Sequence, residues 1–374
     1  MSNTPMQYKQ LKKAELHLHF DGSISIDFVH SIINKQKIVL QKFWSLQDIE
    51  DGKVTKPFLQ KLIYARQDME SLVEYLKAFE ITGACMQTEE NLIASMNDVV
   101  ENYVLPNNIT HVELRYAPAF HTGSGLSIAQ VHDIVMKAAL AASKQHSVSI
   151  TIIACTMKLF GPQDKNTLET YELYFKKYDL DQGYDQAGPE CMFQPPEYIE
   201  QISKLPIPIT IHAGEAFGPA HVKEAIECGA LRIGHGVRMR EDPEVVQLVK
   251  EKRVLLEMCP TSNTQTNVEN IKKDLTDYPM RQYLLDGIRV CINTDNQMIS
   301  QCTISSEIEL MVDKLKLEPV EVLMILDFGY QGAFLEEAMK QKLRSEAFEW
   351  NAKLLSELDP EIKTHFAERM KLFE

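Results

Sequence analysis

Eight short apolar runs recur along this chain, and their alternation with longer helical stretches is the feature that most limits its possible folds. The runs are rich in β-branched residues, and most of the intervening stretches carry apolar residues at helical spacing. Strands connected by helices pair in parallel, and eight parallel strands can close into a barrel. The expected strands are residues 14–20, 111–117, 148–155, 178–186 as the weakest, 207–215, 231–236, 254–259 and 288–295.

The interval between the first two expected strands is longer than a crossover helix needs. Roughly ninety residues lie there, and residues 71–86 and 88–105 within them have helical spacing. We interpret residues 24–105, approximately, as a helical insertion after the first strand. No internal repeat, low-complexity tract or linker marks a domain boundary. We therefore expect residues 1–374 to form a single domain.

Helical spacing also marks the stretch after the second strand and the end of the chain. Residues 127–146 are expected to form a helix that opens at Ser127, whose hydroxyl suits an N-cap, and residues 318–335 to form another. After about residue 345 the chain is amphipathic, with an interruption near Pro360. We expect a C-terminal helical extension there.

The acidic balance of the chain disfavours two classes of partner. There are 39 Lys and Arg against 53 Asp and Glu, which gives a formal net charge of -14. A nucleic-acid groove or an anionic membrane surface needs clustered cations. The sequence also has no run of about eighteen apolar residues that could span a bilayer. We therefore expect a small or neutral partner, with no nucleic acid and no membrane.

The cysteines and the first residues bear on the cellular compartment. The 7 cysteines are scattered without a CxxC pair, and several end apolar runs, where a reduced thiol behaves as a small hydrophobe. The opening residues, MSNTPMQYKQLKK, contain no apolar segment of signal-peptide length. These observations predict reduced cysteines and a cytoplasmic location.

Histidines and acids gather at the ends of the expected strands, where parallel barrels place their chemistry. His17 and His19 have the strand period of two, so both side chains leave the same face and can form two arms of a chelate. His212 and Asp295 end two later strands. Taken singly, each has an ordinary alternative as a structural histidine or a turn-forming aspartate. Taken together, three imidazoles and one carboxylate suit one zinc ion that keeps a position for water.

Two further polar residues stand beside this set. Glu215 follows His212 after a turn-permitting Ala-Gly pair, and His235 lies between two glycines at the end of another strand. The glycines allow close backbone approach, so the imidazole can stand at the rim of the site, although a plain glycine turn is the alternative. A barrel used only as a binding protein, with a structural metal site, would not need these two groups. The additional groups favour an enzyme.

Six motifs, in this order, resemble those of the adenosine deaminase family of the amidohydrolase superfamily. They are HLHFDGS, HVELRYAP, HAGE, RIGHG, CPTSNTQT and INTDN, and the resemblance covers roughly residues 12–345. It implies a (β/α)8 TIM barrel, one zinc ion per chain, and hydrolytic removal of the 6-amino group of a purine nucleoside. The implied reaction, part of purine salvage, converts adenosine or 2'-deoxyadenosine to inosine or deoxyinosine and ammonia.

The resemblance also implies a role for each motif residue. Matches to the zinc ligands are His17, His19, His212 and Asp295. Glu215 matches the proton donor, and His235 matches the partner of the attacking water. Either His235 or Asp295 is expected to take a proton from that water, so the expected catalytic residues are Glu215, His235 and Asp295.

Four residues are expected to contact the substrate: His19, Asp21, Gly188 and Asn296. By resemblance, Asp21 meets a ribose hydroxyl and the backbone of Gly188 approaches purine N3. Many relatives carry a second aspartate where this chain has Asn296. Purine N7 is an acceptor, and an amide donates an N–H to it without first having to be protonated. Asn296 therefore fits purine binding.

Other substrates and other enzymes are alternatives. Adenine, adenosine 5'-phosphate and modified adenosines are rivals within the family. Asp21 favours a substrate with a ribose, and the motifs contain no Lys/Arg cluster for a phosphate. A lactone or phosphoester hydrolase of the superfamily would generally need two metals bridged by a lysine or carboxylate at the fourth strand, and residues 179–190 offer no lysine. The H-x-E and P-C-x-x-C signature of cytidine-type deaminases is absent.

Overall fold

Eight parallel strands form the centre of the molecule. The computed structural model describes residues 6–38, 40, 43–44, 53–66, 69, 71–158, 182–190 and 193–374. The strands pair in sequence order within two four-stranded sheets, β1–β4 and β5–β8. They are β1 Lys13–His19, β2 Ile109–Tyr116, β3 Ser149–Met157, β4 Gln182–Ala187, β5 Thr210–Ala213, β6 Arg232–His235, β7 Leu255–Met258 and β8 Val290–Ile292. All eight expected strands are confirmed, although residues 178–181 of the weakest lie outside the described residues.

Two single bridges join the sheets into a closed barrel. One connects β4 to the residues just ahead of β5, and the other connects Leu18 in β1 to Asp295 beyond β8. At the second bridge the His19 N–H donates to the Asp295 carbonyl at 2.7 Å, and the Asp295 N–H donates to the His17 carbonyl at 2.9 Å. Strand β1 is buried along almost its whole length, as in a barrel covered on the outside. The predicted (β/α)8 barrel is confirmed.

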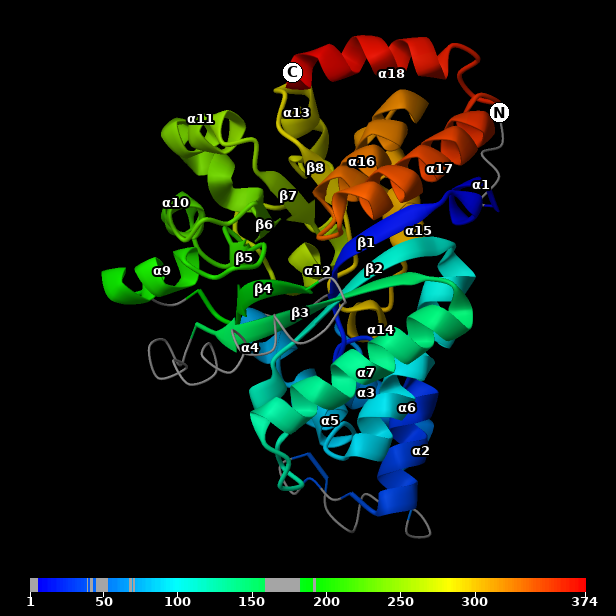
Figure 1. The fold of residues 1–374 in the computed structure, drawn as a ribbon, viewed down its shortest axis with the longest axis vertical. Coiled ribbons are helices and arrows are strands. Elements are labelled where there is room, and N and C mark those ends of the chain that lie inside the picture. The colour runs from blue at the N-terminus through cyan, green and yellow to red at the C-terminus, as the bar shows by residue number, and fades with distance from the viewer. Residues whose placement is uncertain are drawn as a thin grey trace.

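Helices follow most of the strands and cover the outside of the barrel (Figure 1). They are α7 Ile128–His146, α9 Pro196–Ser203, α10 Pro219–Glu227, α11 Pro243–Glu251, α13 Met280–Leu285, α15 Ile304–Leu315 and α16 Pro319–Gly332. Two shorter helices, α12 Pro260–Gln265 and α14 Gln297–Ser300, follow the carboxyl ends of β7 and β8 instead. The expected N-cap of α7 is present, because the Gln130 N–H donates to Ser127 Oγ at 3.2 Å and the Gln130 side chain accepts from the Ser127 N–H.

A layer of helices follows β1 and lies at the lower end of the molecule in Figure 1. Its described helices are α2 Ile26–Gln36, α3 Lys56–Ile63, α4 Leu72–Tyr75, α5 Ala78–Ala84 and α6 Glu89–Val99, which continues as a π-helix over Val100–Val104. The helical insertion is therefore confirmed. The stretch 71–86 is not one helix, because residues 76 and 77 form a turn between α4 and α5. Such a short turn hardly disturbs the apolar spacing from which a helix is predicted.

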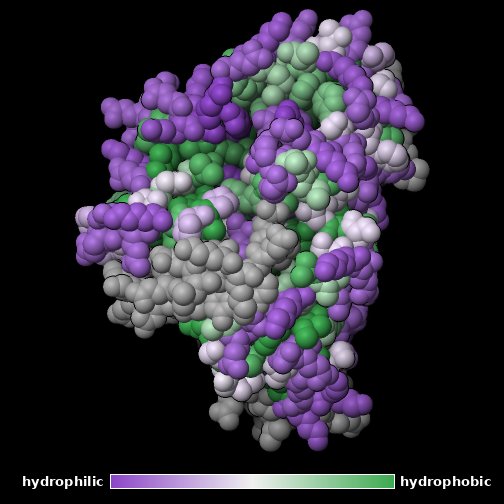
Figure 2. All heavy atoms as spheres, in the orientation of Figure 1, coloured by the Kyte–Doolittle hydropathy of each residue, from purple (hydrophilic) through white to green (hydrophobic). Residues whose placement is uncertain are grey.

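The C-terminal helices lie at the opposite end, with α1 Met6–Gln10 (Figure 1). Helix α17 Glu337–Leu355 and helix α18 Ile362–Met370 are separated by the expected interruption at Pro360. Asn351 ties α17 to the start of β1, because its side chain exchanges two hydrogen bonds with the backbone of Lys12, at 2.7 and 2.8 Å. Figure 2 shows that hydrophilic side chains dominate this face of the molecule, with hydrophobic ones in smaller areas between them.

One hydrophobic core joins the barrel to its helical layers. Its buried residues run from Tyr8 to Phe366 and come from both sheets, the insertion and the C-terminal helices. Five of the described cysteines are free thiols, as expected: Cys85, Cys228, Cys259, Cys291 and Cys302. None of the described helices combines the length and the apolar character that a bilayer crossing requires.

A network of buried charges lies inside the barrel. Arg232 in β6 is 1% exposed, and its guanidinium contacts Glu113 in β2 and, at 2.6 Å, Glu257 in β7. It also donates to the Gly332 carbonyl at 2.7 Å. Burial alone would raise the pKa of Glu257, but Arg115 and Arg232 outweigh it and hold that pKa well below its usual range. The network therefore fixes three strands to one another by paired charges.

Arg232→Ala is expected to destabilise the barrel strongly. The change leaves Glu113 and Glu257 buried without one cation, and removing one partner of a buried pair costs about 3–5 kcal/mol. Urea unfolding monitored by circular dichroism measures the effect. The matched control is Lys204→Ala, which removes an exposed pair with Glu200 on α9 and should leave the midpoint in place. Equal midpoints for the two variants would contradict the structural role given to Arg232.

Candidate active site

A cavity of about 830 Å³ opens at the carboxyl ends of the strands. Its lining includes His19 after β1, Met157 at the end of β3, Gly188 after β4, and side chains of α4 and α5. Three residues expected to bind substrate, His19, Asp21 and Gly188, thus line one cavity. Its volume is typical of sites for small molecules.

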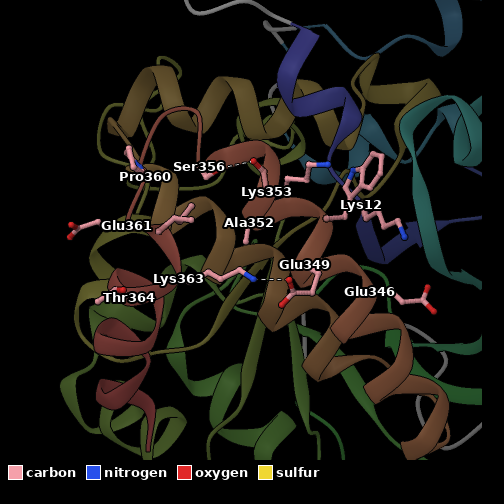
Figure 3. A pocket seen from close by; sticks show the side chains of 12 residues that line it. Lys12, Glu346, Glu349, Ala352, Lys353, Ser356, Pro360, Glu361, Lys363 and Thr364 are labelled. Atoms are coloured by element: carbon pink, nitrogen blue, oxygen red, sulfur yellow. Dashed lines mark hydrogen bonds and ion pairs between the residues drawn. The ribbon is translucent and has the colours of Figure 1, made fainter.

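A second hollow, of about 750 Å³, lies at the other end of the barrel, between α17 and α18. Lys12, immediately before β1, is part of its wall. Figure 3 shows charged side chains around it, including an ion pair between Lys363 and Glu349 at 2.6 Å. None of the expected site residues lines this hollow. The cavity at the carboxyl ends of the strands is therefore the candidate active site.

Four donor atoms converge below the cavity. His212 Nε2 lies 3.1 Å from His17 Nε2 and 3.2 Å from His19 Nε2. Asp295 Oδ1 lies 3.4 Å from His17 Nε2 and 3.2 Å from His19 Nε2. In a tetrahedral site with metal–nitrogen bonds of about 2.0–2.1 Å, the donor atoms are about 3.4 Å apart. The spacing and the donor types therefore fit one metal ion.

His235 lies at the edge of the same cluster. His17, His212, His235 and Asp295 each offer one ligand atom, and these atoms lie within 4.8 Å of one another. Five side chains thus meet at this point, one more than the four expected ligands. All are buried except His19, which is half-buried and faces the cavity.

Two carboxylates orient two of the imidazoles. Glu257 Oε2 accepts from His17 Nδ1 at 2.8 Å, and Asp185 Oδ2 accepts from His212 Nδ1 at 2.9 Å. Each imidazole therefore carries its proton on Nδ1 and turns the Nε2 lone pair towards the cluster. Burial, opposed by Asp185, lowers the pKa of His212 to about 3, so this imidazole is neutral, as a metal ligand must be.

Arg115 holds the two orienting carboxylates together. Its guanidinium donates to Glu257 at 2.7 Å and to Asp185 at 3.2 Å, and it is fully buried in β2. Burial would raise the pKa of Asp185, but His212 and Arg115 lower it below its usual range. Both carboxylates therefore stay ionised and keep their acceptor role.

The backbone conformation is strained at two of the clustered residues. His235 and Asp295 have φ values of 66° and 65°, which non-glycine residues rarely adopt. Both follow or end a short strand at the cavity. Ser262 supports Asp295 by donating from Oγ to Oδ2 at 2.6 Å, so the second carboxylate oxygen is held while Oδ1 faces the imidazoles. Strain of this kind is typical of residues whose position matters for function.

Glu215 lies beside the cluster, and the pKa of its carboxyl group is raised. Thr266 Oγ1 lies 2.9 Å from its Oε1, and His235 Nε2 lies 3.6 Å from its Oε2. Burial, followed by the nearby carboxylates of Asp295 and Glu190, raises the pKa of Glu215 to about 8. A buried carboxyl group that is protonated at neutral pH can act as a general acid.

The remaining expected residues surround the cavity in different ways. Gly188 has φ of 89°, a conformation that leaves its backbone free to approach a ligand. Asp21 lines the cavity, and its Oδ1 is buried without a hydrogen-bond partner among the described residues. Asn296 packs against Gly22, where an added Cβ would meet the amide oxygen at 2.0 Å. Asn296 Oδ1 also lacks a described partner, so the amide keeps a free acceptor.

Several residues that shape the site were not predicted. Asp185 lies in the weakest expected strand, residues 178–186, Ser262 lies within the CPTSNTQT motif, and Glu257 is an acid inside an apolar strand. An ionisable residue in the middle of a buried strand indicates an ion-pair or hydrogen-bond partner in the protein interior. That signal was present for Glu257, but its partner His17 is 240 residues away.

Comparisons with known proteins agree with this geometry. A family model described as adenosine deaminase matches residues 12–350. The adenosine deaminase of Enterococcus faecalis is 34% identical over 339 residues, which cover 90% of this chain and 95% of that protein. The adenosine deaminase of Vibrio vulnificus is 33% identical over 348 residues, covering 91% of this chain and 99% of that protein.

Solved structures show the same fold at lower sequence identity. An adenine deaminase from Arthrobacter aurescens superposes with a TM-score of 0.78 at 22% identity, covering 91% of this chain and 99% of that one. An amidohydrolase from Burkholderia ambifaria with bound Zn gives a TM-score of 0.78 at 17% identity, covering 95% and 96%.

Asp185→Asn is expected to weaken metal binding by about 10–100-fold, the usual effect of removing a carboxylate behind a ligating imidazole. The amide can still accept one hydrogen bond but no longer stabilises the proton on His212 Nδ1 by charge. Competition with a chromophoric chelator measures the affinity for a divalent ion. Asp327→Asn is the matched control, since Asp327 is buried and paired with Arg344 far from the cluster. Unchanged affinity in Asp185→Asn would contradict the role of Asp185.

Proposed function

The chain belongs to the adenosine deaminase family, a family of hydrolases acting on C–N bonds, and from this premise we propose that it deaminates adenosine and 2'-deoxyadenosine with the help of one zinc ion. The products are inosine or deoxyinosine and ammonia, which places the reaction in purine salvage. The observation that carries the proposal is the convergence of His17, His19, His212 and Asp295 beside a protonated carboxyl group, Glu215.

Zinc is the metal that this donor set suits best. Three imidazole nitrogens and one carboxylate oxygen are borderline-to-hard ligands, and three or four protein ligands leave a position for water. Zinc bound there supplies hydroxide at neutral pH, because it lowers the pKa of water to about 7. The orientation of His17 and His212 by Glu257 and Asp185 is the arrangement that favours such binding.

Glu215 supplies the proton that the purine needs. Attack of water at C6 disrupts the aromatic ring, and negative charge develops at N1. A protonated Glu215 donates to N1 as the new C–O bond forms, and a base of the site accepts one proton from the water. That proton passes to the amino nitrogen, so that ammonia leaves when the C–N bond breaks, and the proton of the new hydroxyl returns to Glu215 as the carbonyl forms. Burial keeps Glu215 protonated at neutral pH, so no additional acid is required.

The cavity favours a neutral nucleoside over a nucleotide. Among the described residues that line it, Lys77 is the cation, and Asp21 and Glu80 are anions. A phosphate would meet no cluster of positive charge there. Asp21, with an unpartnered oxygen, accepts a hydrogen bond from a ribose hydroxyl, and Gly188 and Asn296 approach the purine. Adenine lacks the ribose, so it would leave Asp21 unsatisfied.

Zinc-loaded protein is expected to consume adenosine and 2'-deoxyadenosine at least tenfold more efficiently than adenine or adenosine 5'-phosphate. The loss of adenosine absorbance measures the rate, and chromatography identifies inosine. Removal of the metal with a chelator should abolish turnover, and added zinc should restore it. If the protein instead prefers adenine or adenosine 5'-phosphate, the proposed substrate is wrong. No turnover of any 6-aminopurine by the reloaded protein would refute the proposed activity.

Glu215→Gln is expected to lower kcat by about 10²–10⁴-fold while KM changes little, because the amide keeps the shape of the side chain but cannot donate the proton. The wild-type kcat depends on protonated Glu215, so it should be constant near neutral pH and fall as pH rises through about 8. This alkaline limb should vanish in Glu215→Gln. Glu227→Gln, an exposed position on α10, is the control. Full turnover by Glu215→Gln would exclude Glu215 as the proton donor.

A further inference from the structure

A chain of two hydrogen bonds ends on His235. We propose that Asn263, fixed by Tyr278, holds His235 in the tautomer with its proton on Nε2, so that this imidazole acts as a hydrogen-bond donor in the site. His235 is then neither a metal ligand nor the base that accepts a proton from water. The inference deepens the proposed function and rests on it only for the catalytic consequence.

The three side chains form a line that leads away from the cluster. His235, at the end of β6, places Nδ1 3.0 Å from Asn263 Nδ2 in α12. Asn263 Oδ1 accepts from the Tyr278 hydroxyl at 2.8 Å. All three residues are at most 2% exposed. Water therefore does not compete for these bonds, and each polar atom depends on its partner in the chain.

The Tyr278 hydroxyl fixes the direction of the bonds. Among the described residues its recorded acceptor is Asn263 Oδ1, at 2.8 Å. Burial keeps the phenol of Tyr278 protonated, since it raises its pKa well above the usual value. The hydroxyl proton then goes to Asn263 Oδ1, and the amide nitrogen of Asn263 faces His235.

The opposite orientation of the amide is disfavoured. With the Asn263 side chain turned over, its nitrogen, which can only donate, would face the Tyr278 oxygen. The hydroxyl proton of Tyr278 would then lose its acceptor in a buried position, and an unsatisfied buried donor is costly. The amide N–H therefore points at His235.

An imidazole that accepts at Nδ1 carries its proton on Nε2 when it is neutral. His235 Nε2 faces the site, 3.6 Å from Glu215 Oε2. Its N–H is thus available to an oxygen atom at the cluster.

In this tautomer His235 differs from the other four side chains of the cluster in the atom that it presents to the site. His17 and His212 donate from Nδ1 to carboxylates, which leaves Nε2 bare for a metal ion. His235 has the reverse arrangement, with an amide donor behind it. A nitrogen that already holds a proton cannot bind a metal or accept a second proton. Of the two candidates for the base, Asp295 is then the one left, and His235 orients the attacking water by donating to it.

Nuclear magnetic resonance of zinc-loaded protein with 15N-labelled histidine tests the tautomer directly. Bare and protonated imidazole nitrogens have well-separated 15N shifts, and comparison with His235→Gln assigns the signals of His235. We expect a bare Nδ1 and a protonated Nε2 in the wild-type protein. In Asn263→Asp a carboxylate replaces the amide donor, so the proton should move to Nδ1. The same variant should lose about 10²–10⁴-fold in kcat with little change in KM.

Tyr278→Phe is a second variant that keeps the test open if Asn263→Asp does not fold. Without the hydroxyl, the Asn263 amide is no longer fixed, and both tautomers of His235 should appear. The matched controls are Tyr330→Phe, which removes a buried hydroxyl bonded to Thr110, and Asn107→Asp in the segment before β2. Neither should alter the His235 signals.

Two results would overturn the inference: a bare Nε2 on His235 in the wild-type protein, or an unchanged tautomer in both Asn263→Asp and Tyr278→Phe. The spectra do not depend on the substrate. If the zinc-loaded protein turns over no aminopurine and yet His235 behaves as expected, the proposed function fails and the tautomer assignment stands.

Discussion

The closure of the barrel between β8 and β1 is the constraint on which the site depends. Asp295 exchanges backbone hydrogen bonds with His17 and His19, and the same pairing sets the distances between their side chains. Three of the four donors therefore come from one seam, and His212 faces it from β5. The seam also explains the positive φ of Asp295, since the residue must pair with β1 and still turn its carboxylate inward.

Charge inside the barrel serves both the fold and the site. Arg115 and Arg232 neutralise Glu257, and Glu257 in turn orients His17. Burying isolated charges would be prohibitive, but here each charge has partners with good geometry. The two arginines therefore let the barrel contain carboxylates that a purely apolar interior would exclude. Stability and metal binding are coupled through them, because the same carboxylate satisfies both.

The sequence was sufficient for the strands and for the residues that meet in the cluster. His17 and His19 share a face by strand period, and the other donors end expected strands, so local spacing and the closure of parallel strands already bring them together. The hydrogen bonds that orient these side chains were not predictable in the same way. The direction of the bonds from Tyr278 to Asn263 to His235 depends on the position of the Tyr278 hydroxyl against the Asn263 amide, and only the folded chain brings these groups together.

Two carboxyl groups in one site have opposite protonation because their neighbours differ. Burial would raise the pKa of Asp295, but the adjacent imidazoles of His17 and His19 outweigh burial and hold that pKa well below the usual range. Glu215 is equally buried and has carboxylates nearby rather than cations, so its pKa is raised to about 8. These opposite shifts support the proposed roles of Glu215 as the general acid and Asp295 as the base, because the two environments move the two pKa values apart. A donor N–H on His235, lying between them, is compatible with both, since it stabilises negative charge on oxygen and competes for no proton.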